Sequence, residues 1–306
     1  MNILFYTAGD NGQEWVESLS RALPHASISV WPRFGPTVDY ALLWKPPPEM
    51  IAALTGARAV FNLGAGVDAV ATAPNWPTGV PLVRLEDAGM AEQMAEYVTY
   101  AVLRCYREFG AYEAAQAAAR WAPRPRRDKD AFAVGLLGMG VLGTRVAQAL
   151  RCFNFPLRGW SRTGKDLPGV TSFTADQRAV FLAACRVLVC LLPLTRATRG
   201  LLDRDTLMQL PQGAYVVNVA RGALIIENDL IALIDRGHLA GAMLDVFEDE
   251  PLRAGHPFWH HPGIVLTPHV AALTSIAQSV AQIAAKIVRL EAGLPISGKI
   301  DASSAY

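Results

Sequence analysis

Residues 135–143 read GLLGMGVLG and place three glycines at G-x-G-x-x-G spacing between an apolar run and a helical pattern. In a strand–loop–helix unit, the first glycine permits a tight turn, the second lets a phosphate approach the backbone, and the third lets helix and strand pack closely. The start of the helix adds N–H donors and a partial positive charge. A glycine-rich turn of an ordinary βαβ unit is the alternative, but a second strand-like run follows at the right spacing. The loop therefore predicts a dinucleotide site made by Gly138, Met139, Gly140, Val141, Leu142 and Gly143.

Short apolar runs alternate with helical patterns along the whole chain, and many of these runs are apolar on both faces, as buried parallel strands are. The alternation predicts an α/β protein with two doubly wound parallel-sheet domains, of Rossmann or flavodoxin type, and an interdomain cleft. We expect a substrate domain from residues 1–98 plus 275–306 and a dinucleotide-binding domain from residues 99–274. The last helical pattern, near 274–292, has no predicted strand after it and is expected to fold back on the first domain.

The composition restricts the partners and the compartment. Hydrophobic residues make up 52% and charged residues 18% of the chain, so a large core is expected. A net charge of +1 gives no concentrated field for nucleic acid or a membrane surface, and no apolar stretch is long enough to span a bilayer. The N-terminus lacks the features of a signal peptide, and the cysteines show no C-x-x-C spacing. A cytoplasmic location is expected.

The residues after the next strand predict which dinucleotide binds. NAD-binding proteins usually carry an acidic residue there, which accepts hydrogen bonds from the ribose 2′-hydroxyl. This chain has Ser161 and Arg162 instead, followed by Thr163 and Lys165. A guanidinium holds a phosphate with two N–H donors, and the hydroxyls and the lysine add further donors. The segment predicts NADP(H) in preference to NAD(H); the alternative is that Arg162 is a solvated loop cation.

Three further stretches follow predicted strands of the second sheet, at the edge where open α/β sheets bind ligands. They carry Arg221 in VVNVARGALI, Glu250 in AMLDVFEDEPL and His269 in IVLTPHVAA. Taken singly, these residues could be a surface charge, an acidic turn and a buried histidine. Together they supply what reduction of a 2-oxo acid needs: an imidazole to donate a proton, a carboxylate to orient it, and a guanidinium to hold the substrate's carboxylate.

The segments GLLGMGVLG, NVARGALI, LDVFEDEPL and LTPHVAA, in this order and spacing, resemble the D-isomer-specific 2-hydroxyacid dehydrogenase family over essentially the whole chain. ALLWKPPPEM, NLGAGVD, RLEDAGMAEQMAEY and GWSRTGK resemble the NADPH-using glyoxylate/hydroxypyruvate reductase A group of that family. The resemblance implies that Arg221, Glu250 and His269 carry catalysis and that Asp245 lies near the nicotinamide amide. It also implies a homodimer and a substrate domain built from both chain ends. Further residues expected to contact the coenzyme are Leu192, Pro193, Val219 and Ala220.

Two segments of the first domain are candidates for binding the substrate. The loop NLGAGVD contains Gly64, Ala65, Gly66 and Val67, whose backbone N–H groups are expected to bind the substrate carboxylate. A glycine-rich turn before a helix is the alternative. Trp44 follows a buried strand and is expected to wall the substrate pocket, with core packing as the alternative.

No metal site is expected. His256 and His260 have a spacing that suits zinc when both lie on a helix, but Pro257 and Pro262 argue for a loop beside the active site. Residues 88–121 predict one long helix, used either for dimer packing or as a hinge within one chain, and the exposed connection APRPRRDKD follows it.

These expectations combine into one reaction. The chain is predicted to use NADPH to reduce small 2-oxo acids, converting glyoxylate to glycolate and hydroxypyruvate to glycerate. Two alternatives remain at this point: a reductase of a bulkier 2-oxo acid, or a non-catalytic protein that senses dinucleotides and regulates partners.

Overall fold

The computed structural model describes residues 1–9, 11–64, 66–67, 70 and 75–300, and it divides the chain into two units. One unit comprises residues 1–90 and the chain from 274 onward, and the other comprises residues 91–273. The chain thus passes from the first unit to the second between residues 90 and 91, before the predicted boundary at 98/99. The division falls there because helix α4, Met90–Tyr106, buries Met94, Ala95 and Val98 in the core of the second unit.

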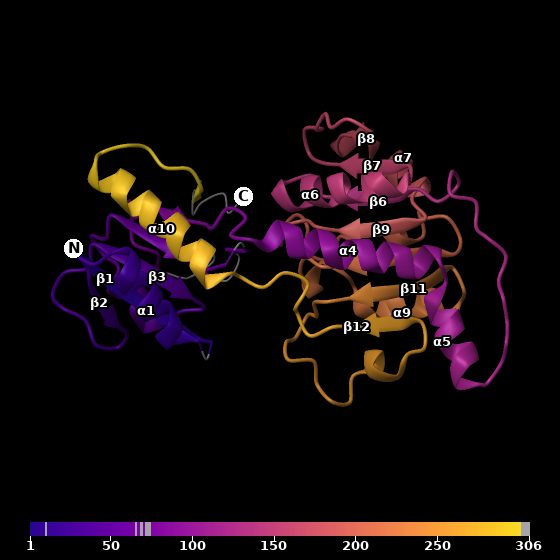
Figure 1. Ribbon diagram of the computed structural model, residues 1–306, viewed down its shortest axis with the longest axis horizontal. Coiled ribbons are helices and arrows are strands. Elements are labelled where there is room, and N and C mark those ends of the chain that lie inside the picture. Colours follow the sequence, from indigo (N-terminus) through magenta and orange to yellow (C-terminus); the bar gives the residue numbers. More distant parts are fainter. Residues whose placement is uncertain (10, 65, 68–69, 71–74, 301–306) are drawn as a thin grey trace. The chain divides into compact units, whose positions relative to one another are not determined.

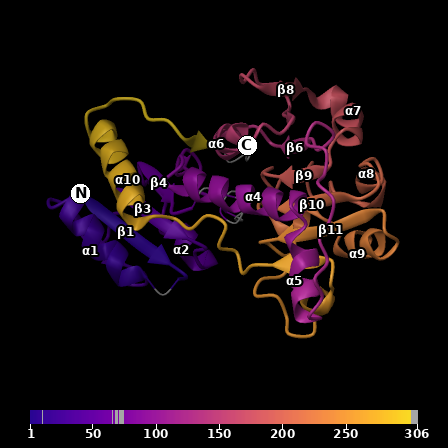
Figure 2. The ribbon, with the colours of Figure 1, turned by 45° about the vertical axis from the view of Figure 1, so that its right-hand side comes forward.

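The first unit contains a sheet with the order β2-β1-β3-β4-β5-β13. The first five strands are parallel and have the order of a flavodoxin-like sheet, whereas β13 pairs antiparallel with β5. Helix α10 packs beside α1 (Figures 1 and 2). The elements are β1 (Asn2–Thr7), α1 (Gly12–Ala22), β2 (Ser27–Val30), β3 (Tyr40–Trp44), α2 (Pro48–Ala52), β4 (Ala59–Asn62), β5 (Leu82–Val83), α10 (Ile276–Glu291) and β13 (Lys299–Ile300).

The second unit contains a fully parallel sheet with the order β12-β11-β10-β9-β6-β7-β8, the order of a Rossmann sheet extended by one strand. Its strands are β6 (Val134–Leu137), β7 (Leu157–Trp160), β8 (Val170–Phe173), β9 (Val187–Cys190), β10 (Ala214–Asn218), β11 (Leu239–Leu244) and β12 (Ile264–Leu266). Its helices are α4, α5 (Phe109–Ala117), α6 (Val141–Leu150), α7 (Arg178–Ala183), α8 (Arg204–Leu207) and α9 (Glu227–Asp235), with short 3₁₀ helices at Arg151–Phe153, Ala175–Gln177, Gly222–Leu224 and Pro257–His260.

Both faces of this sheet are buried, as the doubly apolar strands predict. Val134, Leu136 and Val189 pack on the side of α4 and α6, and the alternate residues Leu137 and Leu188 pack on the side of α7, α8 and α9. The period of two sends successive side chains to opposite faces of a strand. The α/β doubly wound class predicted from the sequence is therefore confirmed.

Two local expectations were wrong. The long helix predicted over 88–121 is broken after Tyr106, because Glu108 adopts the left-handed conformation and its carboxylate forms ion pairs with Arg124 and Arg127. A short strand, β13, does follow α10; its two residues are too few to give a periodic signal.

Candidate active site

The predicted site segments of the second unit all follow strands of its sheet, so they meet at the carboxyl edge. The strand order reverses at β6, between β9 and β7, which is where sheets of this kind bind ligands. The segments, in chain order, are 138–143 after β6, 161–165 after β7, 192–193 after β9, 219–221 after β10, 245–250 after β11 and 267–269 after β12.

The glycine loop has the geometry that a pyrophosphate requires. Gly138 has φ +115°, and a Cβ on Gly143 would lie 2.0 Å from the Gly138 carbonyl oxygen, so neither position accepts a side chain. Around Gly140 nothing lies within 4 Å of the place where a Cβ would be. Gly140 also begins α6 without a side-chain cap. The loop therefore combines open space with an uncapped helix start, which fits a bound dinucleotide phosphate.

The other loop residues predicted to bind coenzyme have different surroundings. The Met139 side chain is buried and occupies the space that a side chain at Gly159 would need. Leu142 is half-buried in the same core. Val141 is exposed at the first position of α6. Only the backbone of Met139 remains available to a ligand, because its side chain belongs to the core.

The end of β7 and the turn after it carry two cations and two polar atoms without hydrogen-bond partners in the described part of the chain. The buried Nε1 of Trp160 and the buried Oγ of Ser161 have no hydrogen-bond partner among the described residues. Arg162 is exposed in the turn, and Lys165 donates from Nζ to Thr144 Oγ1 at 2.8 Å. Lys165 thereby brings its charge to the first turn of α6. The donors fit a phosphate bound between this turn and the glycine loop.

Thr144 was not among the residues predicted from the sequence, although its position directly after Gly143 could have signalled it. Thr163, which was predicted, is exposed in the same turn. In the segment after β9, Leu192 is buried, and the Pro193 carbonyl accepts a hydrogen bond from Thr198 Oγ1 at 2.7 Å.

A buried asparagine braces the turn that carries Arg221. Asn218 Oδ1 accepts from the Ala220 N–H at 3.2 Å, and its Nδ2 donates to the Arg221 carbonyl at 2.9 Å. Val219 and Ala220 are buried, and Arg221 Nη1 donates to the Ala220 carbonyl at 2.7 Å. A Cβ on Gly222 would lie 1.8 Å from the Phe247 carbonyl carbon. This close approach holds the turn that carries Arg221 against the 245–250 segment. Asn218 was missed by the sequence analysis.

His269 and Glu250 form the predicted pair. His269 Nδ1 lies 2.7 Å from Glu250 Oε2, and Glu250 Oε1 accepts from the Phe247 N–H at 3.1 Å. The His269 side chain is 44% exposed, and its backbone has φ +57°, a conformation that is uncommon for a residue other than glycine. Because the carboxylate engages Nδ1, the other ring nitrogen, Nε2, is left to exchange a proton with a ligand.

Asp245 anchors the loop that holds His269. Its carboxylate accepts from Thr267 Oγ1 at 2.5 Å, from the Val270 N–H at 2.9 Å and from the Ala271 N–H at 2.8 Å. The Asp245 carbonyl accepts from the His269 N–H at 2.8 Å. Asp245 is fully buried, and these contacts hold the unusual backbone of His269 in place. This positioning role was not predicted.

Tyr97 of α4 supports the same loop. Its hydroxyl lies 2.5 Å from Thr267 Oγ1. Thr267 Oγ1 donates its one proton to the Asp245 carboxylate, so the Tyr97 hydroxyl is the donor to Thr267 Oγ1. Burial, together with the nearby Asp245 charge, raises the pKa of Tyr97 to about 12, so the phenol keeps its proton at neutral pH. Tyr97 and Thr267 thus position His269 through Asp245.

The first unit holds the residues predicted to bind substrate. Trp44 ends β3, and its ring occupies the space of a Gly64 side chain, since a Cβ there would lie 2.4 Å from Trp44 Cζ3. Asn62, which the sequence analysis missed, donates from Nδ2 to the carbonyls of Gly64 and Gly66 at 2.7 and 2.9 Å. Val67 is buried, and Ala65 lies outside the described residues. Asn62 and Trp44 therefore shape this loop.

The described residues contain no cluster of side chains suited to a metal ion. The prolines do not prevent a helical turn, since Pro257 opens a short 3₁₀ helix that ends at His260; proline is tolerated at the start of a helix. His256 Nε2 lies 3.0 Å from Glu227 Oε2, and its Nδ1 accepts from the Phe258 N–H, so this ring is used within the protein. Among the residues placed in the structure, we find no helix with both the length and the apolar character needed to cross a bilayer.

Comparisons with known proteins identify the family of the chain. Residues 99–271 match the family described as "D-isomer specific 2-hydroxyacid dehydrogenase, NAD binding domain". The chain is 46% identical over the full length of both sequences to glyoxylate/hydroxypyruvate reductase A of Serratia proteamaculans.

Two solved structures also align with essentially the whole chain. One is a D-isomer specific 2-hydroxyacid dehydrogenase of Xanthobacter autotrophicus in complex with NADPH, with a TM-score of 0.94 and 40% identity over 100% of this chain and 99% of that one. The other is an NADPH-dependent glyoxylate/hydroxypyruvate reductase of Sinorhizobium meliloti in complex with NADP, with a TM-score of 0.93 and 33% identity over the same shares. The resemblance recognised in the motifs is thereby confirmed, and the chain belongs to the D-isomer specific 2-hydroxyacid dehydrogenase family.

Proposed function

We propose that the protein reduces small 2-oxo acids, glyoxylate and hydroxypyruvate first, with NADPH. The observation that carries the proposal is the His269–Glu250 pair, 2.7 Å apart, on the same sheet edge as Arg221 and the glycine loop. The relatives named glyoxylate/hydroxypyruvate reductase support the choice of substrates.

The chain's own residues supply the acid and the positive charge. Bound NADPH supplies a hydride to the carbonyl carbon of the substrate. Negative charge then develops on the carbonyl oxygen, and we assign its protonation to His269 Nε2. The Glu250 carboxylate, which is hydrogen-bonded to His269 Nδ1, orients the imidazole ring and stabilises the imidazolium. We assign to Arg221 the binding of the substrate carboxylate and of the developing oxyanion, because a planar guanidinium offers paired donors.

We propose that NADP(H) is preferred over NAD(H) because of the turn after β7. Arg162 and Lys165 bring positive charge there, and no acidic residue occupies 161–165 to repel a 2′-phosphate. The unpartnered Ser161 Oγ provides a further donor. The NADPH and NADP complexes of the two relatives support this assignment.

Arg162→Ala tests both the reaction and the coenzyme assignment. With glyoxylate, wild type is expected to oxidise NADPH far faster than NADH. The variant should lose about 10- to 100-fold in kcat/KM for NADPH, the worth of one charge-assisted contact of about 1.5–3 kcal/mol, and keep its value for NADH. Arg236→Ala, which removes an exposed arginine at the end of α9, is the matched control. An unchanged coenzyme ratio in Arg162→Ala would remove Arg162 from this role.

A substrate series separates the remaining alternatives. Turnover that rises from glyoxylate and hydroxypyruvate to phenylpyruvate would favour the bulkier 2-oxo acid. No turnover with any of them, combined with tight NADPH binding, would favour a dinucleotide-sensing protein.

Thr267→Val tests whether the loop anchor supports catalysis. The change keeps the shape of the side chain but breaks the contacts from Tyr97 and to Asp245. We expect kcat to fall about 10-fold, since a hydrogen bond to a charged group contributes about 1.5–3 kcal/mol, while KM for NADPH changes little. Thr267→Ser retains the hydroxyl and should restore kcat. Equal kcat values for the valine and serine variants would contradict the positioning role.

We further propose that the loop containing Gly64, Gly66 and Val67, next to Trp44, binds the substrate carboxylate through its backbone N–H groups. We also propose that Asp245 lies near the nicotinamide. The bracing of the loop by Asn62 supports the first assignment. The match of residues 99–271 to an NAD-binding domain supports giving the coenzyme to the second unit.

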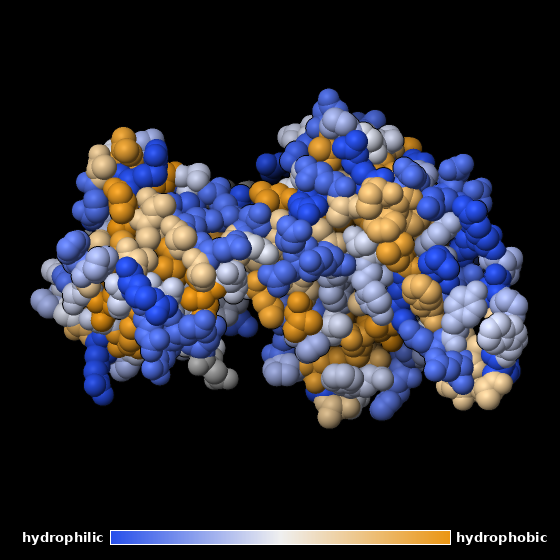
Figure 3. All heavy atoms as spheres, in the orientation of Figure 1, coloured by the Kyte–Doolittle hydropathy of each residue, from blue (hydrophilic) through white to orange (hydrophobic). Residues whose placement is uncertain are grey.

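A cytoplasmic homodimer is also part of the proposal. The cysteines are free thiols, which suits a reducing compartment. Tyr100 of α4 and Trp121, which follows α5, are exposed, and Trp121 is 98% exposed. Figure 3 shows a few hydrophobic residues scattered among hydrophilic ones at the surface over α4 and α5. Large exposed aromatic groups are typical of subunit contacts.

A further inference from the structure

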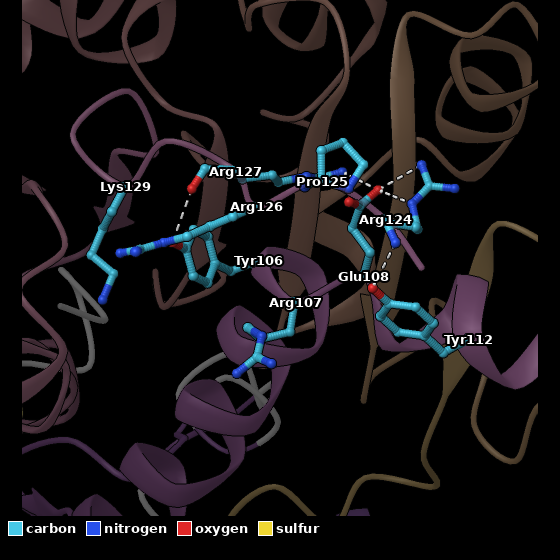
Figure 4. A pocket seen from close by; sticks show the side chains of 9 residues that line it. All are labelled: Tyr106, Arg107, Glu108, Tyr112, Arg124, Pro125, Arg126, Arg127 and Lys129. Carbon is cyan, nitrogen blue, oxygen red and sulfur yellow. Dashed lines mark hydrogen bonds and ion pairs between the residues drawn. The ribbon is translucent and has the colours of Figure 1, made fainter. Parts of the chain in front are cut away.

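A pocket of about 420 Å³ is formed where α4 ends, α5 begins and the segment 124–129 crosses them (Figure 4). Tyr106, in its wall, packs against Phe132 just before β6, with ring centroids 5.1 Å apart. Lys129 donates from Nζ to the carbonyl of Phe153, beyond the end of α6. These contacts place the pocket at the amino edge of the sheet, whereas the glycine loop follows the carboxyl end of β6.

The walls of the pocket are fixed by hydrogen bonds. The Glu108 carboxylate, whose side chain is 14% exposed, lies 2.8 Å from Arg124 Nη2 and 2.9 Å from Arg127 Nη2. The Arg124 N–H donates to Tyr112 Oη, and Tyr106 Oη donates to the Arg127 carbonyl, both at 3.2 Å. Figure 4 shows Tyr106, Glu108 and Tyr112 in contact with the segment 124–129. The segment is therefore held in a defined conformation before any ligand binds.

Glu108 stays ionised in this setting. Burial by itself opposes its charge, but the hydrogen bond from Arg124 and the charge of Arg127 outweigh burial and hold the pKa of Glu108 below its ordinary value. The carboxylate can therefore neutralise one arginine, not two.

Positive charge remains in excess around the pocket. The lining includes five cationic side chains, Arg107, Arg124, Arg126, Arg127 and Lys129, and Glu108 is the one carboxylate among the lining residues. Arg107 and Arg126 are exposed, and their guanidinium groups make no ion pair with the described residues. The Arg107 Cζ atom lies 5.7 Å from the centroid of the Phe109 ring. A cavity with fixed walls and unpaired guanidinium groups at its rim suits an anion.

We propose that this pocket binds a small phosphate anion with two or more charges, such as pyrophosphate or the diphosphate group of an organic phosphate. Guanidinium groups fit phosphate oxygens with paired donors, and the pocket's size falls within the range of about 300–1,000 Å³ that is typical of small-molecule sites. The site lies at the opposite strand ends from the glycine loop and takes no part in the proposed reaction.

Calorimetric titration of the full-length protein with pyrophosphate tests the proposal, in saturating NADP⁺ so that the coenzyme site is filled. Wild type should bind pyrophosphate with saturation. Arg107→Ala/Arg126→Ala should bind it at least about 10-fold more weakly, because two charge-assisted contacts are lost. Arg107→Gln/Arg126→Gln should behave alike while keeping side-chain length. Arg120→Ala/Arg236→Ala removes two exposed arginines outside the pocket lining and should bind as wild type does.

Two results would overturn the proposal. One is the absence of pyrophosphate binding to wild type, and the other is equal affinity in the wild type and the Arg107/Arg126 variants. If wild type does not bind pyrophosphate and the variants change oligomeric state, the cations serve a subunit contact instead. Citrate, titrated in parallel, should bind more weakly; equal or tighter binding would assign the pocket to polycarboxylates instead.

Discussion

Replacing His269 with alanine is expected to lower kcat for glyoxylate reduction by about 10²–10⁴-fold, the usual contribution of a general acid. The expectation follows from the geometry of its ring, in which Nδ1 is held by Glu250 at 2.7 Å and Nε2 is left for the substrate. The ring is not needed to bind the coenzyme, so KM for NADPH should stay near the wild-type value. Glu250→Gln should give a smaller loss, because the proton donor stays but its carboxylate partner is removed.

The matched control for this prediction is His261→Ala. His261 also pairs with a carboxylate, Asp235 Oδ1, at 3.1 Å from its Nε2, but it precedes β12 and therefore lies at the amino edge of the sheet. Its removal should change kcat by less than about twofold, because the ring lies at the edge of the sheet opposite the site and its two nitrogens contact Asp235 and the Gly263 N–H. A His269→Ala enzyme with more than about a tenth of wild-type kcat would show that the proton comes from another group.

The carboxyl edge of the second sheet could be predicted from the sequence because its information is local. Each predicted strand is a short apolar run, and each site segment comes directly after one, as Arg221 does after β10 and His269 after β12. Parallel strands bring their ends to one edge, so the order of segments along the chain is enough to assemble the site. The glycines are equally local, since their spacing reflects contacts within one strand–loop–helix unit.

The supports of the site could not be predicted, because they depend on packing between distant segments. Tyr97 reaches Thr267 across 170 positions of the chain, and nothing near Tyr97 in the sequence indicates that its hydroxyl is needed. The break between α4 and α5 is similar, since Glu108 leaves the helical conformation where two arginines of a later segment meet its carboxylate. Periodicity describes the burial of a helix face and carries no information on such polar contacts.

Replacing Arg221 with glutamine is expected to lower kcat/KM for glyoxylate by about 10³-fold, since truncating one partner of a buried, hydrogen-bonded charge pair costs about 2–5 kcal/mol. The guanidinium is directed by a rigid turn, in which Asn218 holds the Arg221 carbonyl and Gly222 packs directly on the Phe247 backbone. Both parameters should change: KM should rise because the carboxylate loses its partner, and kcat should fall because the developing oxyanion loses a donor. Steady-state kinetics across glyoxylate concentrations measures the two effects separately.

Arg221→Lys decides whether charge alone is sufficient at this position. A lysine restores the positive charge but not the planar pair of donors, so it should recover only part of the lost kcat/KM. Arg199→Gln is the control, because Arg199 is 61% exposed and lies 3.8 Å from Glu248 on the neighbouring segment. Its loss should change kcat/KM by less than about twofold, as for most exposed ion pairs. Full activity in Arg221→Lys would limit the role of Arg221 to its charge, and a rise in KM without a fall in kcat in Arg221→Gln would limit it to holding the ground-state carboxylate.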